Sequence, residues 1–437
     1  MLQTSAPDAR LASDHSDLTT PSADGRRVVI VGGGFGGLAC ARAMGRAALD
    51  VVMIDRRNHN LFQPLLYQVA TAALSPADIA EPIRKSLGKC RNVRVLMAEV
   101  VGVDTTAKRV LLADGQTVAY DCLVLATGSK YNYFGHDEWQ EAAPGLKTIR
   151  EARQIRQRLL SAFERAEATS DPEEARALLT SVVIGGGPTG VEMAGAISEL
   201  GRFMVGRDFR NIRPEDLRVL LVEAGPRILA AFPEELTDYA ADYLRKMGVD
   251  ILLGQRVTDV GPGRIAINGA EMAVGAIIWG AGVKPSAAAR WLGLSGDGRV
   301  PVDSRLAVEG FQDIYALGDT ALALGADGKP YPALAQVAKQ QGHYLGKALN
   351  KRILDGAVAA PFIFRNRGNT AVIGRNAAIF DFGSWRLKGR LAWLLWAIVH
   401  VFLLISFEKR LLVSIQWIWR YITRQRGARI IDEDPHL

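Results

Sequence analysis

The stretch Val-Val-Ile-Val-Gly-Gly-Gly-Phe-Gly-Gly, residues 28–37, decides the fold of this chain. Its apolar half predicts a short buried strand, and the glycines read G-x-G-x-x-G where that strand must turn into a helix. Such a turn places backbone N–H groups at a helix N-terminus against a pyrophosphate, an approach that only glycine permits. The stretch therefore predicts a Rossmann-type dinucleotide-binding unit.

A second stretch of the same kind occurs later in the chain. The apolar residues 182–184 lead into Gly-Gly-Gly-Pro-Thr-Gly, residues 185–190. One fingerprint is weak evidence, but two, each between a strand and a helix, indicate two dinucleotides, most naturally a flavin and a nicotinamide. We therefore predict an α/β fold with two Rossmann-type domains, as in disulfide-reductase-like flavoproteins.

Each fingerprint is followed by an acid at the end of the next strand. Asp55 lies 23 residues after Gly32, where a Rossmann fold places the carboxylate that binds a ribose hydroxyl. Glu223 is further from its fingerprint because a basic segment, residues 202–218, is inserted as a helix extension and loop. Glu223 would accept hydrogen bonds from ribose and repel a 2′-phosphate, which favours NADH over NADPH, although Arg227 nearby weakens that preference.

Length and composition fit a two-domain enzyme with an additional C-terminal region. A chain of 437 residues is too long for one core. We expect a disordered tail over 1–25, because it is polar and has no apolar run. We expect an FAD-binding domain over 26–150 and 295–350, an NADH-binding domain with a helical linker over 151–294, and a membrane-associating region over 351–437.

The three cysteines, Cys40, Cys90 and Cys122, are far apart and form no C-x-x-C pair. They favour neither a disulfide framework nor a metal site, so we expect buried apolar roles, a reducing compartment and no bound metal.

The basic charge is concentrated at the C-terminal end. Residues 386–429 hold nine Lys or Arg and one acidic residue, Glu408, a local charge of +8, whereas the whole chain carries +7. Five of the eight tryptophans lie in residues 385–419. A nucleic-acid partner is not expected, because basic residues beside tryptophans and apolar runs are typical of a bilayer interface.

Residues 391–407 form a 17-residue run in which only His400 can carry a charge, just short of the roughly 20 residues of a spanning helix. Residues 411–423 are amphipathic, with Leu411, Leu412, Ile415, Ile418 and Ile422 at helical spacing. Our preferred interpretation is an anchor that lies in the plane of the membrane. A helical hairpin that closes a dimer interface, or a single spanning helix, remains open.

The chain returns to the first domain through Tyr-Ala-Leu-Gly-Asp, residues 315–319, where Asp319 can contact a flavin ribityl or position a pyrophosphate. A helix is predicted from Ala333 to about Leu349, because prolines precede it. Gln336, Lys339 and Gln340 share one edge of its first turns. Its free N–H groups would stabilise negative charge on a reduced flavin.

Together these motifs resemble type II NADH:quinone oxidoreductases over nearly the whole chain from Arg26. The most specific are Asp-Arg-Arg-Asn-His-Asn-Leu-Phe-Gln-Pro-Leu-Leu-Tyr-Gln-Val-Ala, residues 55–70, and Ala-Gln-Val-Ala-Lys-Gln-Gln, residues 335–341. The others are the two fingerprints, residues 32–37 and 185–192, together with Ala-Thr-Gly (126–128), Val-Glu-Ala-Gly-Pro-Arg-Ile-Leu (222–229), Trp-Gly-Ala-Gly-Val (279–283) and Tyr-Ala-Leu-Gly-Asp (315–319).

The resemblance implies an FAD site, an NADH site and a quinone site. The expected FAD residues are Gly32, Gly33, Gly34, Phe35, Gly36, Gly37, Asp55, Arg56, Pro64, Val100, Thr127, Gly128, Gly318, Asp319, Ala335 and Gln336. The expected NADH residues are Gly185, Gly186, Gly187, Pro188, Thr189, Gly190, Glu192, Glu223 and Gly282. Gln336, Lys339 and Gln340 would border the quinone, and the family commonly has a different residue in place of Lys339. Glu192 is either a proton relay or a residue that positions nicotinamide or flavin.

The implied activity is NADH oxidation with transfer of two electrons through FAD to ubiquinone or menaquinone, without proton pumping. The implied location is the cytoplasmic face of the inner (plasma) membrane, with a homodimer possible.

Three other functions are compatible with twin fingerprints. A sulfide:quinone reductase needs a redox cysteine pair, which this chain does not provide. A soluble ferredoxin or rubredoxin reductase leaves the tryptophan-rich end unused. A non-catalytic NADH-binding sensor, like the apoptosis-inducing flavoproteins, would turn over slowly or not at all.

Overall fold

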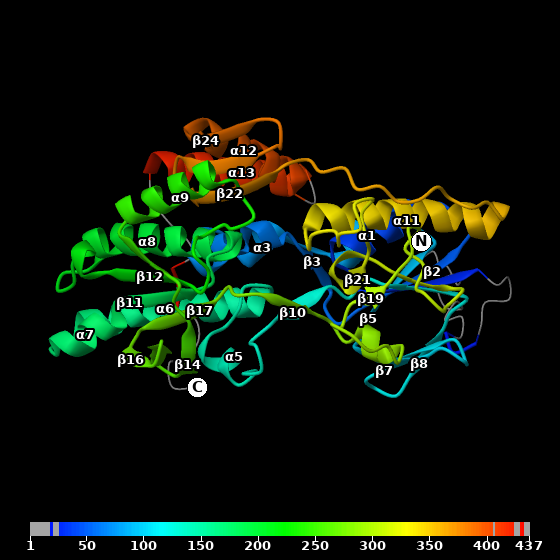
Figure 1. The fold of residues 1–437 in the computed structure, drawn as a ribbon, viewed down its shortest axis with the longest axis horizontal. Coiled ribbons are helices and arrows are strands. Elements are labelled where there is room, and N and C mark those ends of the chain that lie inside the picture. The colour runs from blue at the N-terminus through cyan, green and yellow to red at the C-terminus, as the bar shows by residue number, and fades with distance from the viewer. Residues whose placement is uncertain (1–17, 21–25, 405–406, 424–428, 432–437) are drawn as a thin grey trace, which may run out of the picture. The chain divides into compact units, whose positions relative to one another are not determined.

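The computed structural model describes residues 18–20, 26–404, 407–423 and 429–431 (Figure 1). Contacts divide the chain into two compact units. Unit 1 comprises residues 1–60, 82–129 and 285–365, and unit 2 comprises 61–81, 130–284 and 366–437. Each unit is therefore discontinuous in sequence.

Unit 1 is built on a five-stranded parallel sheet in the order β20-β9-β1-β2-β5. The strands are β1 (Arg27–Val31), β2 (Asp50–Asp55), β5 (Val93–Met97), β9 (Cys122–Leu125) and β20 (Ile314–Ala316). Strand β1 pairs with β2 on one side and β9 on the other, and its valines and isoleucine are at most 4% exposed. A central parallel strand is covered on both faces, which is why residues 28–31 are continuously apolar.

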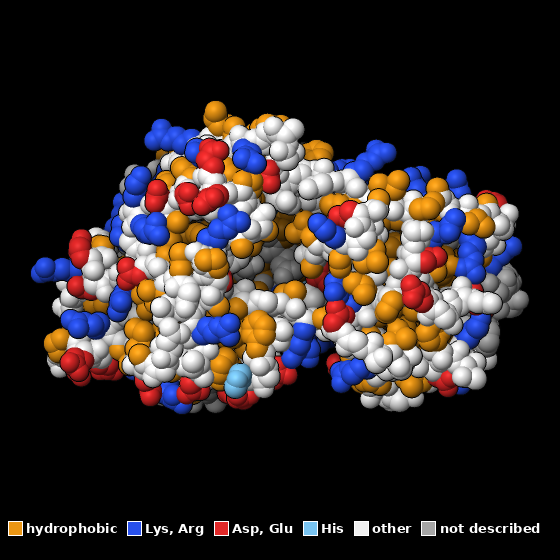
Figure 2. All heavy atoms as spheres, viewed as in Figure 1, with side chains coloured by type: hydrophobic (Ala, Val, Ile, Leu, Met, Phe, Trp, Pro, Cys, Tyr) orange, Lys and Arg blue, Asp and Glu red, His pale blue; other side chains and the backbone are white. Residues whose placement is uncertain are grey.

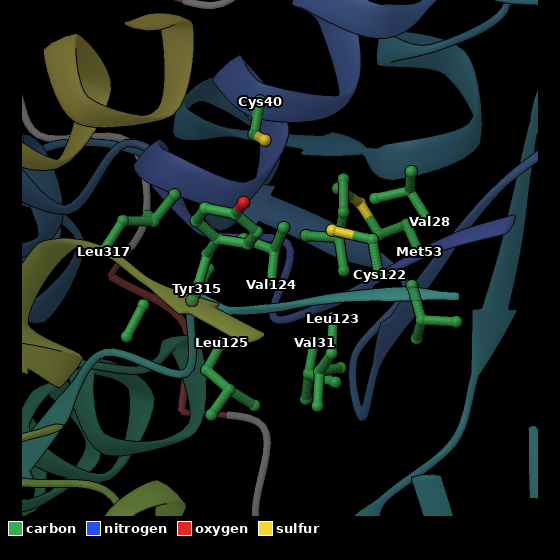
Figure 3. Packing of buried hydrophobic residues seen from close by; sticks show 14 of the residues in the cluster. Val28, Val31, Cys40, Met53, Cys122, Leu123, Val124, Leu125, Tyr315 and Leu317 are labelled. Atoms are coloured by element: carbon green, nitrogen blue, oxygen red, sulfur yellow. The ribbon is translucent and has the colours of Figure 1, made fainter. Parts of the chain in front are cut away.

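The two faces of this sheet are covered by different side chains (Figure 3). Cys122 and Val124 of β9 point toward the helix that carries Cys40, whereas Leu123 and Leu125 point to the opposite face. This alternation is the period of two expected of a strand. All three cysteines are free thiols, and Cys40 and Cys122 are buried. Burial raises the pKa of both thiols, that of Cys122 to about 12, so they act as packing groups.

Helices α1 (Phe35–Met44) and α11 (Ala335–Asp355) lie side by side in unit 1 (Figure 1). Glycine brings them close, because a Cβ on Gly342 would lie 2.1 Å from the carbonyl oxygen of Gly36. A Cβ on Gly346 would lie 2.5 Å from that of Cys40. The helix from the first fingerprint and the helix of the Ala-Gln-Val-Ala-Lys-Gln-Gln motif are thus in direct backbone contact.

Smaller elements complete unit 1. They are α4 (Ile83–Ser86), α10 (Ala288–Trp291), the 3-10 helix η4 (Gly318–Thr320), the antiparallel sheet β6 (Val100–Asp104), β7 (Arg109–Leu112) and β8 (Thr117–Ala119), and the parallel pair β19 (Val300–Pro301) and β21 (Ala321–Leu322). Two further ladders, β3 (His59–Leu61) with β4 (Ala80–Pro82) and β10 (Ser129–Tyr131) with β18 (Val283–Pro285), contain the residues where the chain passes between units.

Unit 2 repeats the plan of unit 1. Its parallel sheet has the order β13-β12-β11-β17, and β11 (Thr180–Ile184) pairs with both β12 (Arg218–Glu223) and β17 (Ala276–Trp279). The edge strand is β13 (Val249–Leu253), and α8 (Pro188–Asp208) follows the second fingerprint. In both units the strand before the glycines is central and the strand that ends in an acid is its neighbour.

The other elements of unit 2 are the following. The helices are η2 (Gln63–Leu65), α2 (Leu66–Ala70), α3 (Pro76–Ile79), α5 (Trp139–Ala142), α6 (Ile149–Ala168), α7 (Pro172–Leu178), η3 (Pro214–Asp216), α9 (Glu234–Lys246), α12 (Arg390–Leu403) and α13 (Phe407–Thr423). The antiparallel sheets are β14 (Val257–Gly261), β15 (Arg264–Ile267) and β16 (Ala270–Ala273), and β22 (Asn369–Gly374), β23 (Ala377–Asp381) and β24 (Arg386–Gly389).

The expected elements are present with small shifts at their ends. Helix α1 begins at Phe35, within the fingerprint, and α11 begins at Ala335 and continues to Asp355. The insertion before Glu223 is an extension of α8 to Asp208 followed by a loop, as the sequence predicts.

The units are assembled from more pieces than the expected domains. Residues 61–81 and 130–150 belong to unit 2 although we expected them in the FAD-binding domain, and 351–365 belong to unit 1. The reason is long-range packing, since α2 packs against α6 and α8.

Part of the expected N-terminal tail is placed on unit 1, and residues 1–17 and 21–25 lie outside the described residues. The carbonyl of Leu18 accepts from the backbone N–H of Ala119 at 2.8 Å, and that of Thr20 accepts from Nη1 of Arg27 at 2.6 Å.

Charge is mixed on the face drawn in Figure 2, where Lys and Arg side chains alternate with Asp and Glu. Within the described residues, none of the helices is both long enough and apolar enough to cross a membrane.

Candidate functional site

The first fingerprint combines a tight turn, close packing and an open cradle. Gly32 has φ +108°, and a Cβ there would lie 2.3 Å from the carbonyl oxygen of Ala126. A Cβ on Gly37 would lie 1.9 Å from the carbonyl oxygen of Gly32, so helix and strand touch at this point. Gly34 differs, because nothing lies within 4 Å of the position of a Cβ. It is the N-cap of α1 and faces the open space that a pyrophosphate needs.

Asp55 locks this turn from the end of β2. Its Oδ2 accepts from the backbone N–H of Gly33 at 2.6 Å, and its Oδ1 accepts from that of Arg57 at 2.7 Å. Each oxygen keeps a lone pair for a ribose hydroxyl. Arg56, which follows Asp55 in the sequence, is exposed. Asn60 donates a hydrogen bond to the carbonyl of Gly33 at 2.7 Å. The sequence reasoning did not identify Asn60.

The second fingerprint in unit 2 has the same geometry. Gly185 has φ +100°, and a Cβ there would lie 2.7 Å from the backbone nitrogen of Ala281. A Cβ on Gly190 would lie 1.8 Å from the carbonyl oxygen of Gly185. Gly187, the N-cap of α8, again faces open space, with Pro188 in the first turn. The residues of both fingerprints thus fit a bound pyrophosphate.

Glu223 takes the place of Asp55 in unit 2. Its Oε2 accepts from the backbone N–H of Gly186 and its Oε1 from that of Gly225, each at 2.6 Å. The neighbouring Arg227 donates to the carbonyl of Ala230 at 2.9 Å, so this guanidinium is engaged with its own loop. The orientation of this carboxylate is therefore fixed by two glycines.

Hydroxyl groups gather at the carboxyl ends of β9 and β20 in unit 1. Thr127 Oγ1 is hydrogen-bonded to Ser286 Oγ and, at 3.1 Å, to Thr320 Oγ1, which accepts from the backbone N–H of Gly128 at 2.8 Å. Asp319 Oδ2 accepts from Ser129 Oγ at 2.5 Å. Of these, the sequence indicated Thr127, Gly128 and Asp319. Ser129 and Thr320 directly follow the Ala-Thr-Gly and Tyr-Ala-Leu-Gly-Asp motifs but are not among the predicted residues, and Ser286 comes from a segment without a recognisable motif.

Helix α11 is tied to this cluster by Gln341. This buried side chain accepts from the backbone N–H of Gly318 at 2.7 Å through Oε1. Gln341 lies in the Ala-Gln-Val-Ala-Lys-Gln-Gln motif, but the sequence predicted Gln336, Lys339 and Gln340 as site residues and not Gln341. Its burial could not be read from the motif alone.

The other α11 residues lie on the same helix with different exposure. Ala335 and Gln336 are half-buried in the first turn, and Lys339 is exposed. Gln340 pairs with the backbone of Arg365, donating to its carbonyl at 2.9 Å and accepting from its N–H at 3.1 Å. Gln340 therefore holds the segment after α11 in place, whatever further role it has.

Glu192 lies in unit 2 on α8, two residues after the last glycine of the second fingerprint. A Cβ on Gly195 would lie 1.9 Å from the carbonyl oxygen of Ile373, so α8 packs tightly on β22. The backbone N–H of Val372 in this strand hydrogen-bonds the Glu192 carboxyl. Burial nevertheless dominates and raises the pKa of Glu192 from 4.5 to about 8.

Two further residues of the expected FAD site lie in other elements. Pro64 is in η2 of unit 2, and Val100 begins β6 and packs against the core of unit 1. Phe35 is half-buried in the first turn of α1, Thr189 is half-buried at the start of α8, and Gly282 is exposed after β17. The described residues contain no cluster of three His, Cys, Asp or Glu side chains that could hold a metal.

Two fingerprints, each locked by an acid and each opening a helix, define the class of two-dinucleotide oxidoreductases. Residues 26–342 match the family model for pyridine nucleotide-disulphide oxidoreductases, and 366–425 match the NDH2 C-terminal domain. The chain is 39% identical to the Type II NADH:quinone oxidoreductase Ndh of Mycobacterium tuberculosis, over 93% of this chain and 90% of that protein. The chain belongs to the type II NADH:quinone oxidoreductase family.

Further comparisons agree. Type II NADH:quinone oxidoreductase NdhA of Mycobacterium tuberculosis is 38% identical over 94% of this chain and 91% of that protein. The structure of NDH2 from Plasmodium falciparum in complex with RYL-552 has the same fold, with a TM-score of 0.85 and 22% identity over 93% of this chain and all of that chain. Family membership makes FAD and NADH the dinucleotides of this protein.

The raised pKa of Glu192 predicts a pH-dependent stability. Between pH 4.5 and about 8 the folded state holds a proton that the unfolded state releases, so this carboxyl lowers stability as pH rises. A glutamine is neutral at every pH and keeps an oxygen for the Val372 N–H. Thermal melting of Glu192→Gln should therefore match the wild type near pH 4 and occur at a higher temperature at pH 8.5.

The matched control is Glu271→Gln, which changes an exposed carboxylate in the same unit. It should show no gain at pH 8.5. Equal melting temperatures of Glu192→Gln and wild type at all pH values would contradict a raised pKa for the half-buried Glu192.

Proposed function

We propose that this chain is a peripheral membrane flavoenzyme that oxidises NADH and passes two electrons through FAD to a membrane quinone without pumping protons. The observation that carries the proposal is an arrangement that occurs twice in the chain. In each case a glycine-rich turn leads into a helix N-terminus and is hydrogen-bonded by an acid at the end of the next strand. Family membership supports the same reaction.

In this proposal the first fingerprint holds FAD. The helix N-terminus at Gly34 receives the pyrophosphate, and Asp55 accepts from the adenosine ribose. Asp319, oriented by Ser129, faces the ribityl chain or the pyrophosphate. The bound flavin supplies the two-electron chemistry, accepting electrons from nicotinamide and returning them to quinone.

The second fingerprint holds NADH in the same way. Gly187 leaves room for the pyrophosphate, and Glu223 accepts from the ribose hydroxyls. A 2′-phosphate at this place would meet the fixed carboxylate, so NADPH is disfavoured. The engagement of Arg227 with Ala230 supports this preference, because that arginine is not directed to a phosphate by its contacts.

Quinone reduction needs electrons and protons at the edge of the flavin. Gln336 and Lys339 on α11 are our candidates for contact with the quinone, and Gln340 holds the adjoining segment through Arg365. Glu192, with a pKa near 8, can hold and release a proton around neutral pH. It acts either in proton supply or in positioning the nicotinamide or flavin.

The activity is tested directly. Purified protein should show a flavin absorption spectrum that NADH bleaches, and ubiquinone-1 or menadione should restore it. Sulfide and reduced ferredoxin should not reduce the flavin. A flavin that NADH reduces but no quinone reoxidises would instead support a non-catalytic sensor.

Glu223→Gln tests the assignment of the second fingerprint. Removing the like charge should narrow the preference for NADH over NADPH, measured as the ratio of kcat/KM values, by roughly tenfold. Glu271→Gln, an exposed change in the same unit, is the control and should leave the ratio unchanged. An unchanged ratio in Glu223→Gln would remove the role we assign to this carboxylate.

The C-terminal helices carry the proposed membrane contact. On α12 the exposed apolar residues include Leu391, Leu394, Ile398 and Phe402, and on α13 they include Leu411, Leu412, Ile415, Ile418, Trp419 and Ile422. The α12 positions recur every three or four residues. On α13 the row Leu411, Ile415, Ile418 and Ile422 has the same spacing, and Leu412 and Trp419 widen it, so each set forms one stripe along its helix. Exposed apolar surface of this extent, in a segment rich in Lys and Arg, suits insertion into a headgroup layer.

The opposite sides of these helices are packed within unit 2. Trp396 of α12 stacks on Trp417 of α13 at 5.4 Å between ring centroids, and Trp417 donates to Gln68 of α2 at 3.0 Å. His400 stacks on Trp396 at 4.4 Å and meets Phe62 edge-on. Burial lowers the pKa of His400 to about 4, so it is neutral at pH 7. The inner faces of α12 and α13 are thus held by packing within unit 2. In our proposal the exposed stripes contact the bilayer at the cytoplasmic face of the membrane.

Point substitutions test the anchor without uncovering this packing. The quadruple variant Leu394→Gln, Ile398→Gln, Ile415→Gln and Ile418→Gln should move the protein from vesicles of phosphatidylcholine and phosphatidylglycerol into the supernatant. Burial of each such side chain is worth about 1.5–3 kcal/mol when complete, and glutamine preserves the helix. Flavin reduction by NADH should persist.

The control replaces Met97, Val101 and Leu324, exposed apolar residues of unit 1, with glutamine and should leave vesicle binding unchanged. A quadruple variant that still sediments with vesicles but changes from dimer to monomer would show that these stripes form a dimer interface instead.

A further inference from the structure

The turn over residues 132–137 in unit 2 is fastened to the carboxyl end of β17. The backbone N–H of Asn132 donates to the carbonyl of Gly282 at 3.3 Å. The indole N–H of Trp279, in β17, is shared between the carbonyls of Asn132 (3.1 Å) and Ala281 (2.8 Å). Lys284 is paired with Asp137 at 2.8 Å. Three of these contacts, from Gly282, Trp279 and Lys284, therefore set the position of this turn against residues 279–284.

Phe134 in this turn combines a left-handed backbone with an exposed aromatic ring. Phe134 has φ +54°, a left-handed conformation that is an outlier for a bulky residue. Its side chain is 63% exposed, so the cost is not recovered by burial in the core. Asn132 stabilises the turn by accepting from the backbone N–H of Phe134 at 2.9 Å. A strained backbone that holds a large apolar ring at the surface is a feature to be explained by function.

The ring of Phe134 lies against Gly282. A Cβ on Gly282 would lie 3.0 Å from Cζ of Phe134, so the absence of a side chain there gives the ring its place. Gly282 itself has φ +70° and is exposed. Phe134 also lies 6.3 Å from Trp279, measured between ring centroids. The ring thus stands beside the end of β17, the neighbour of the fingerprint strand β11.

In an open parallel sheet a dinucleotide lies across the carboxyl ends of the central strands. Its pyrophosphate is expected at Gly187 after β11, so its nicotinamide half extends over the end of the neighbouring β17. We propose that Phe134 is an aromatic wall that packs against the nicotinamide half of NADH, held ready by the strained turn over residues 132–137. The inference rests on the proposed function and names a positioning residue that its motifs do not include.

Two substitutions at one position test the wall. Asn tolerates a left-handed backbone, so Phe134→Asn removes the ring without straining the turn, whereas Phe134→Tyr keeps the ring. Loss of an aromatic contact should raise the NADH concentration needed for half-maximal flavin reduction about tenfold in Phe134→Asn. Phe134→Tyr should stay within about twofold of the wild type, and neither variant should lower the melting temperature or change the KM for quinone.

ADP-ribose, which lacks nicotinamide, separates the two halves of the ligand. Its inhibition constant against NADH should be equal in wild type and Phe134→Asn. An equal loss of NADH and ADP-ribose affinity would place the ring at the adenosine half and overturn the inference, as would unchanged NADH dependence in Phe134→Asn. A wild type whose flavin NADH cannot reduce would instead refute the proposed function, so the two failures are distinguishable.

Discussion

A hydrogen bond between a strand-end carboxylate and the second glycine of a turn is the interaction on which the rest of this structure depends. It occurs twice, from Asp55 to Gly33 and from Glu223 to Gly186, each at 2.6 Å. The bond sets the peptide after the central strand so that the next glycine becomes the N-cap of a helix facing open space. In the proposed function the same acid also binds a ribose hydroxyl, so one carboxylate would both shape the turn and select the ligand.

The close contact of α1 with α11 extends this constraint in unit 1. Gly36 lies within the fingerprint helix, and its carbonyl leaves no room for a side chain at Gly342. Gln341, the residue before it, is thereby buried and reaches the backbone N–H of Gly318. The contact at Gly36 in the first fingerprint therefore also sets the position of α11 and, through Gln341, of the segment that contains Asp319.

In unit 2 the helix that follows the fingerprint, α8, packs closely on β22 of the C-terminal region. Gly195 allows α8 to touch β22, which places the N–H of Val372 on the carboxyl of Glu192. The side chains of α12 and α13 point in two directions. Trp396, Trp417 and His400 pack inward, and the apolar side chains between them stay exposed. A glutamate with a raised pKa and an apolar outer surface thus belong to one packed unit.

The sequence by itself determined the local features: both fingerprints, the strands before them, the acids after them, the apolar run over 391–407 and the amphipathic pattern over 411–423. These depend on residue type and short spacing, because a glycine turn or an amphipathic helix is defined within a few residues. Only the tertiary structure decided what assembles from distant segments. Ser129, Ser286 and Thr320 converge from three parts of the chain, Gln340 engages Arg365, and residues 61–81 join unit 2. The strained Phe134 likewise has no sequence signal, because its conformation is imposed by contacts with Trp279 and Gly282, about 150 residues away.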